Sequence, residues 1–127
     1  MPAMPSLLLV MIGGAAGAGL RWEAGRLALR QFGVGFPWGT LAVNLLGGLL
    51  LGILAGFYLG QGPERPLWLL LAVGLLGGFT TFSAFSLDLF TMLGRGAYAA
   101  ALSYGAASVL GSLLLLALGF WAGRAAT

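Results

Sequence analysis

The chain has 127 residues, of which 60% are apolar and 7% are charged, with a net charge of +3 and a mean hydropathy of +1.02. A soluble domain carries roughly 25% charged residues, so the composition indicates an integral membrane protein. The sequence contains no Cys and no His, which excludes thiol chemistry, thiolate or imidazole metal sites and histidine acid–base catalysis. The arginines are scattered between apolar runs and form no basic stripe of the kind that binds nucleic acid.

Four apolar segments follow one another along the chain, and each is long enough to cross a bilayer. A helix needs about 20 apolar residues to span a hydrocarbon core of about 30 Å. Turn-forming connections separate the segments and read GVGFP, GQGPERP and GRG. Nothing is left over for a soluble domain, so the sequence predicts an all-α membrane protein that consists of a single integral membrane domain. The predicted spans cover residues 6–30, 39–59, 67–93 and 97–121; the first is apolar over about residues 6–20 and continues as an amphipathic helix to Arg30.

The arginines that flank these spans are divided between the two sides of the membrane. Four spans place four arginines on one side and two on the other, and the bias in short loops is what sets orientation. A bias this weak predicts a chain that can insert both ways up. The first side carries Arg21, Arg26, Arg30 and Arg95, and the second carries Arg65 and Arg124.

Glycines recur every four residues along one face of each of the first two spans. Small residues at this spacing let helix backbones approach closely in lipid, and we interpret the rows as packing surfaces. Four closely packed helices enclose little space, so a homodimer is the simplest arrangement that could line a pathway. The rows are Gly13 and Gly17 in the first span and Gly48, Gly52, Gly56 and Gly60 in the second.

Polar side chains within the spans fall on shared helix faces. Thr40 and Asn44 are four residues apart in the second span. Tyr104, Ser108 and Ser112 have the same spacing in the fourth. Each hydroxyl alone is explained by a bond to a carbonyl one turn earlier, whereas a row of them can serve a polar solute in succession. The Asn44 amide needs partners inside the bundle, and a functional role is favoured over a helix–helix hydrogen bond.

No acidic side chain lies at the centre of a predicted span. Glu23 and Asp88 lie near span ends and Glu64 lies in a connection, which argues against a carboxylate proton relay at the midplane. Arg21 either extends its charge to the interface or gathers anions at a pore mouth, and both interpretations stay open.

The stretch GGFTTFSAF, residues 77–85, interrupts the third span with residues of low helix propensity and with hydroxyls that compete for backbone hydrogen bonds. It predicts a break in the helix near the middle of the span. A break at membrane depth must be buried in protein or line a cavity, and its free carbonyls are hard ligands suited to an alkali cation. Phe82 and Phe85 share a helix face, and their spacing alone favours packing, although electropositive ring edges could also hold a small anion.

The same stretch, together with GTLAVNLLGG in the second span and GAGLRW in the first, resembles the Fluc (CrcB) family of fluoride channels. The resemblance covers nearly the whole chain. It implies an antiparallel, dual-topology homodimer with two fluoride pores, in which fluoride leaves the cell passively across the cell (inner) membrane. It also implies a structural sodium ion at the dimer centre, held by backbone carbonyls of Gly77 and Thr80.

The family's functional positions carry over onto matching residues of this sequence. The resemblance implies that Asn44 donates a hydrogen bond to fluoride, that Phe82 and Phe85 line its path, and that Arg21 lies in the vestibule. Further polar residues of the path would be Thr40, Ser83, Tyr104, Ser108 and Ser112.

Two other functions compete with a non-enzymatic fluoride channel. A small dual-topology multidrug exporter has a similar size and four spans, and here it would have to use Glu23 as its membrane-embedded carboxylate. A non-transporting assembly subunit would explain the glycine rows and would require a different partner chain.

Overall fold

The computed structural model describes residues 3–127, with side chains from residue 5 onward. The chain is helical, in the order α1 (Ala3–Phe32), α2 (Trp38–Phe57), η1 (Trp68–Leu76), α3 (Gly77–Phe79), α4 (Phe82–Gly94) and α5 (Tyr98–Ala125). Together η1, α3 and α4 form the third long helix. Among residues 3–127, four helical stretches are long and apolar enough to cross a membrane. The prediction of a multi-pass, all-α membrane protein is confirmed.

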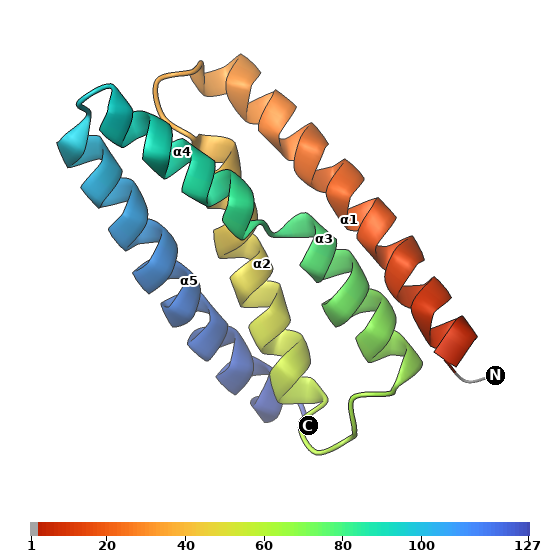
Figure 1. The fold of residues 1–127 in the computed structure, drawn as a ribbon. Coiled ribbons are helices and arrows are strands. Elements are labelled where there is room, and N and C mark those ends of the chain that lie inside the picture. Colours follow the sequence, from red (N-terminus) through yellow and green to blue (C-terminus); the bar gives the residue numbers. More distant parts are fainter. Residues whose placement is uncertain (1–2) are drawn as a thin grey trace.

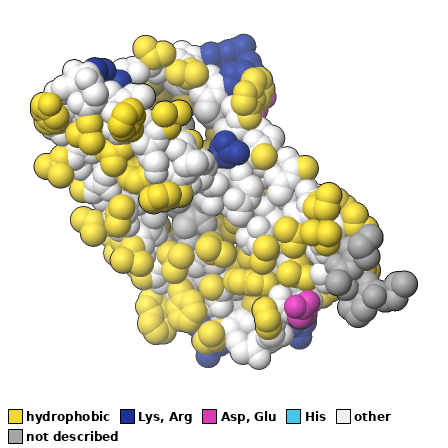
Figure 2. Space-filling model, in the orientation of Figure 1, with side chains coloured by type: hydrophobic (Ala, Val, Ile, Leu, Met, Phe, Trp, Pro, Cys, Tyr) yellow, Lys and Arg dark blue, Asp and Glu magenta, His cyan; other side chains and the backbone are white. Residues whose placement is uncertain are grey.

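The four long helices lie side by side, with both chain ends at the same end of the bundle (Figure 1). α1 packs along η1 and α3, and α2 packs along α5. Hydrophobic side chains are spread over the whole face shown in Figure 2 among backbone and other side chains, while arginines and acidic residues lie mainly near its two ends, with one basic patch nearer the middle. This distribution suits a chain whose middle contacts lipid and whose ends contact water.

Glycines bring α2 and α5 into backbone contact. A Cβ atom on Gly52 would collide with the Leu116 carbonyl oxygen, and one on Gly119 would collide with the Leu49 carbonyl oxygen. Gly56 and Gly123 interlock in the same way one turn further along. The glycine row of the second span is therefore a packing surface, except that Gly60 lies beyond the helix at a φ of +82°.

α1 approaches the first half of the third helix just as closely. A Cβ atom on Gly17 would collide with the Leu75 carbonyl oxygen, and one on Gly78 would collide with the Gly14 carbonyl oxygen. The helix in contact with α1 is widened over Trp68–Leu76 into a π-helix, and the Gly77 N–H donates to the Ala72 carbonyl oxygen at its end. Such long π-helical stretches are rare and often accompany functional sites.

The third helix breaks near its middle, as predicted, but not at the glycines. Gly77 keeps helical dihedral angles (φ −61°, ψ −40°), and the chain leaves the helix at Thr80 (φ −86°, ψ 157°) and Thr81 (φ −153°, ψ 121°). Gly78 has a packing role here, because only a residue without a Cβ fits against α1. Close packing outweighs the low helix propensity of glycine, which is worth about 1 kcal/mol.

A small apolar core holds α2, α4 and α5 together on one side of the break. Its central side chain is Tyr104, which is fully buried and packs against Phe85 and Phe36. At the same end the Arg95 guanidinium donates to the Gly35 carbonyl oxygen and ties the two connections together. The buried members are Leu41, Phe85, Met92, Ala101 and Tyr104.

Candidate functional site

The extended pair Thr80–Thr81 removes helical partners from the backbone around it. In a continuous helix the Thr81 N–H would donate to Gly77, and the Ala84 N–H would donate to Thr80. Here the Thr81 N–H donates to Asn44 Oδ1 at 2.8 Å, and the Ala84 N–H donates to Thr81 Oγ1 at 3.1 Å. Within residues 3–127 neither carbonyl receives a replacement hydrogen bond. The break therefore leaves the Gly77 and Thr80 carbonyl oxygens without donors.

Asn44 holds the break from the neighbouring helix. Its Nδ2 donates to the Thr81 carbonyl oxygen at 3.0 Å while its Oδ1 accepts from the Thr81 N–H. An amide side chain has two N–H donors, so the second N–H of Asn44 remains for another ligand. The prediction that Asn44 needs a partner in the bundle is confirmed, and that partner is the backbone of the break.

The donor-free carbonyls of Gly77 and Thr80 fit the chemistry of an alkali cation. They are neutral, hard oxygen donors, and no cluster of three or more acidic or imidazole side chains competes as a metal site among the described residues. Gly77 is exposed on the chain considered alone. A free carbonyl exposed at membrane depth is costly unless protein or an ion covers it.

One groove runs beside the break and holds about 370 Å³. Asn44, Phe85 and Ser108 come from three different long helices and meet in its wall. Phe82 also lines it, with its ring centroid 5.7 Å from that of Phe85. The two rings differ in burial, since Phe82 is 77% exposed and Phe85 is 8% exposed.

The groove contains an unusual hydroxyl. Ser108 is buried, and its Oγ has no hydrogen-bond partner within residues 3–127. Buried hydroxyls are normally paired, so the unpaired Ser108 hydroxyl in the groove wall is available to a polar ligand. Ser112, one turn further along α5, approaches the Asn44 carbonyl oxygen at 3.5 Å.

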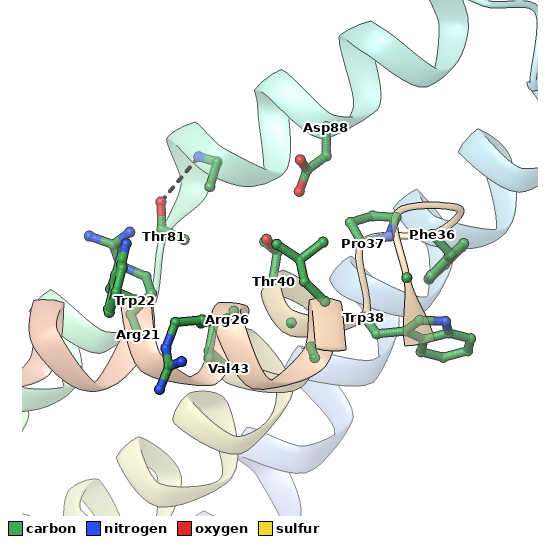
Figure 3. Close-up of a pocket in the computed structure, with 16 residues that line it drawn as sticks. Arg21, Trp22, Arg26, Phe36, Pro37, Trp38, Thr40, Val43, Thr81 and Asp88 are labelled. Atoms are coloured by element: carbon green, nitrogen blue, oxygen red, sulfur yellow. Dashed lines mark hydrogen bonds between the residues drawn. The ribbon is translucent and has the colours of Figure 1, made fainter. Parts of the chain in front are cut away.

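A second pocket, of about 460 Å³, shares Thr81 with the groove in its lining and is drawn in Figure 3. Arg21, Thr40 and Asp88 line it together with Thr81. The Arg21 guanidinium and the Thr40 hydroxyl suit a hydrated anion, whereas the Asp88 carboxylate opposes one. Arg21 also donates from Nε to the Gly78 carbonyl oxygen at 3.1 Å, so it faces both the pocket and the break.

The structure brings most of the predicted site residues to these two cavities. The groove collects Asn44, Phe82, Phe85, Ser108 and Ser112, and the pocket collects Arg21 and Thr40. Two predicted residues line neither cavity. Ser83 is exposed and contacts Thr81 Oγ1, and the buried Tyr104 donates to Asp88 Oδ2 at 3.0 Å.

Sequence reasoning missed the roles of Thr81 and Asp88. Thr81 lines both cavities and caps α4 through its hydroxyl. Asp88 lies three residues after Phe85 on α4, so the rule that residues three apart share a helix face could have placed it near the site. Glu23 pairs with Arg26 on α1, which leaves the exporter alternative without a free carboxylate at that position.

Comparison with known proteins agrees with this geometry. Residues 8–120 match the family model described as CrcB-like protein, Camphor Resistance (CrcB). A protein named fluoride-specific ion channel FluC from Mesorhizobium japonicum is 45% identical, and the match covers 95% of this chain and 98% of the relative. A protein of the same name from Chelativorans sp. is 50% identical, with the same coverage of both chains. Another with the same name, from Phenylobacterium zucineum, is 50% identical over 94% of this chain and 93% of its own length. With this coverage and identity, the chain belongs to the CrcB family, whose members here carry the name FluC.

Proposed function

We propose that this chain forms a fluoride-selective channel that exports fluoride passively across the cell (inner) membrane and so reduces its toxicity. The observation that carries the proposal is the groove beside the helix break, where an amide, an unpaired hydroxyl and two phenylalanines meet at membrane depth. The names of the relatives support the same ion. The proposed activity is transport without a chemical reaction.

The groove can replace the water that fluoride loses on entry. Fluoride is small and strongly hydrated, so a dry pore excludes it unless donors substitute for its hydration shell. The second N–H of Asn44 and the Ser108 hydroxyl are the available donors beside the break. Phe82 and Phe85 add ring edges that attract an anion weakly, which suits an ion that must bind and then leave.

The remaining polar residues extend the proposed path toward water. Arg21 and Thr40 would receive the ion in the pocket, and Ser112 would follow Ser108 along α5. Neither Ser83 nor Tyr104 lines one of these two cavities. Ser83 would reach the ion only if the break changed shape, and Tyr104 would act on the path only through its hydrogen bond to Asp88.

The proposed assembly is an antiparallel homodimer of chains inserted in both orientations. The nearly balanced arginines support dual topology. The exposed Gly77 backbone and the 77% exposed Phe82 ring support a second copy covering this surface. A two-fold axis beside the break would bring the two copies of Gly77 and Thr80 together.

A structural sodium ion at the dimer centre is part of the proposal. The carbonyl oxygens of Gly77 and Thr80 from both chains would hold it, and when bound it would supply a positive charge that neutralises these dipoles and joins the two breaks. The support is the loss of both carbonyls' helical donors.

The test is fluoride efflux from liposomes containing the purified protein, recorded with a fluoride electrode after valinomycin allows potassium to balance the charge. Rapid fluoride release is expected, with much slower chloride release under the same conditions. Equal chloride release would contradict selectivity. Omitting sodium during purification and assay is expected to reduce the flux, and an unchanged flux would remove sodium from the proposal.

A further inference from the structure

The Gly78 carbonyl is a third backbone group left behind by the break. In a continuous helix it would accept from the Phe82 N–H. The extended residues Thr80 and Thr81 lie between Gly78 and Phe82, so the Phe82 N–H no longer reaches the Gly78 carbonyl. The Gly78 carbonyl instead accepts a hydrogen bond from a side chain of another helix. Arg21, 57 residues earlier in the sequence, donates to it from Nε at 3.1 Å.

The position of Arg21 follows from the packing of α1. Gly14, Gly17 and Arg21 lie three and four residues apart, so they share one face of α1. Gly14 contacts Gly78, and Gly17 contacts the Leu75–Phe79 turn. The next turn of the same face then carries the arginine directly to the end of α3. The first half of the third helix ends there with a partial negative charge, which a guanidinium offsets.

We propose that Arg21 is a positioning residue for the helix break, and that it acts through its Nε–H donor. It donates to the Gly78 carbonyl from α1, while Asn44 pairs with the Thr81 backbone from α2. One clamp from α1 thus holds the end of α3 and one from α2 holds Thr81, while the Gly77, Phe79 and Thr80 carbonyls receive no donor within residues 3–127. Arg21 decides which oxygens of the break are available to a ligand. The inference rests on the proposed function only for its flux measurement.

Side-chain chemistry separates this role from simple attraction of anions. Arg21→Gln keeps an N–H donor on the atom bonded to Cδ, where arginine has Nε, but loses the charge. Arg21→Lys keeps the charge but has a carbon at that position. Arg21→Met is similar in length and has neither property. The matched control is Arg30→Gln, because Arg30 is exposed on the same helix and its side chain makes no hydrogen bond within residues 3–127.

Hydrogen exchange in peptides covering residues 76–85 measures the clamp directly, and peptides from α5 report whether the fold is intact. Arg21→Gln and Arg30→Gln are expected to retain wild-type protection of the break. In Arg21→Lys and Arg21→Met the protection factors of these peptides are expected to fall at least about tenfold, because a clamped segment exchanges only through local opening. Unchanged protection in Arg21→Met, or equal protection in the lysine and glutamine variants, would overturn the proposal.

Flux at saturating and at low fluoride provides the second measurement. Arg21→Gln is expected to need a higher fluoride concentration for half-maximal flux but to keep a larger maximal flux than Arg21→Lys. A residue that only collects anions gives the reverse order, and that order would overturn the proposal. If the wild-type protein moved no fluoride, the proposed function would fail while the exchange measurement would still test the clamp.

Discussion

Asn44 and Thr81 exchange two hydrogen bonds across the interface between α2 and the broken third helix, at 3.0 Å and 2.8 Å. One side chain therefore satisfies both the donor and the acceptor of a single backbone residue. The amide donates one N–H to the break and keeps the other, so under the proposed function the same group would hold the break and donate to the ion.

Replacing Asn44 by Asp tests this combination. The carboxylate can still accept from the Thr81 N–H, but it has no donor for the Thr81 carbonyl and places a negative charge beside the path of an anion. We expect fluoride flux to fall at least about 100-fold and thermal stability in detergent to fall, since an orphaned buried group costs about 1–3 kcal/mol.

The control for Asn44→Asp is Gln61→Glu, the same amide-to-acid change in the exposed connection after α2. It should leave flux and melting temperature near those of the wild type. Normal conduction by Asn44→Asp would remove Asn44 from the pathway.

Replacing Phe85 by Ile tests the aromatic wall of the groove. Phe85 packs against Tyr104 with ring centroids 5.1 Å apart, so isoleucine preserves apolar burial but loses the ring edge. We expect a folded protein, destabilised by about 1–2 kcal/mol, whose fluoride flux is severely reduced.

Phe90→Ile is the matched control, because Phe90 lies on the same helix and is 74% exposed. Flux should be unaffected by that change. If Phe85→Ile conducted like the wild type, Phe85 would be a packing residue only.

Replacing Ser108 by Ala should change stability and flux in opposite directions. The Ser108 hydroxyl is buried without a partner, and removing an unsatisfied polar group is neutral or stabilising. Flux should fall about tenfold or more if this hydroxyl replaces a water of the ion, since about 1.4 kcal/mol corresponds to a factor of ten.

Ser103→Ala serves as the comparison on the same helix, where the exposed hydroxyl bonds back to the Ala99 carbonyl. Efflux assays and melting curves on both variants decide the question. A Ser108→Ala protein with intact flux would place this hydroxyl outside the path.

Replacing Gly52 by Ala tests the packing of α2 on α5. The added Cβ would collide with the Leu116 carbonyl oxygen, and backbone cannot move aside as a flexible side chain can. We expect a loss of about 2 kcal/mol or more in unfolding free energy, seen as poor yield and a lower melting temperature.

Gly105→Ala is the control for this prediction, since the nearest atom to its added Cβ is Leu89 Cδ1 at 4.0 Å. It should behave like the wild type or slightly better, because alanine favours helix. Equal stability of the two variants would show that the α2–α5 contact yields more easily than its geometry indicates.

The four long helices, the helix break and the need for a partner at Asn44 could be predicted from the sequence, because each depends on the composition of a short segment. Membrane insertion depends on the hydropathy of about 20 consecutive residues, so the four long helices could be read directly from the chain. The need for a break followed from the composition of GGFTTFSAF, and the need for a partner at Asn44 followed from its amide. These properties belong to short segments and require no knowledge of their neighbours.

Tertiary structure decided the remaining features. The composition of GGFTTFSAF predicted a break but did not fix its position: α1 packs closely on Gly78, the glycines stay helical, and the chain leaves the helix at Thr80 and Thr81. The partner of Asn44 lies 37 residues away, and that of Arg21 lies 57 residues away. Such pairings depend on which helix faces meet, and a one-dimensional pattern of polar residues leaves that choice open. The sequence alone determined that a polar, broken segment lies in the membrane, and the packing of α1 and α2 around it determined which backbone oxygens stay free.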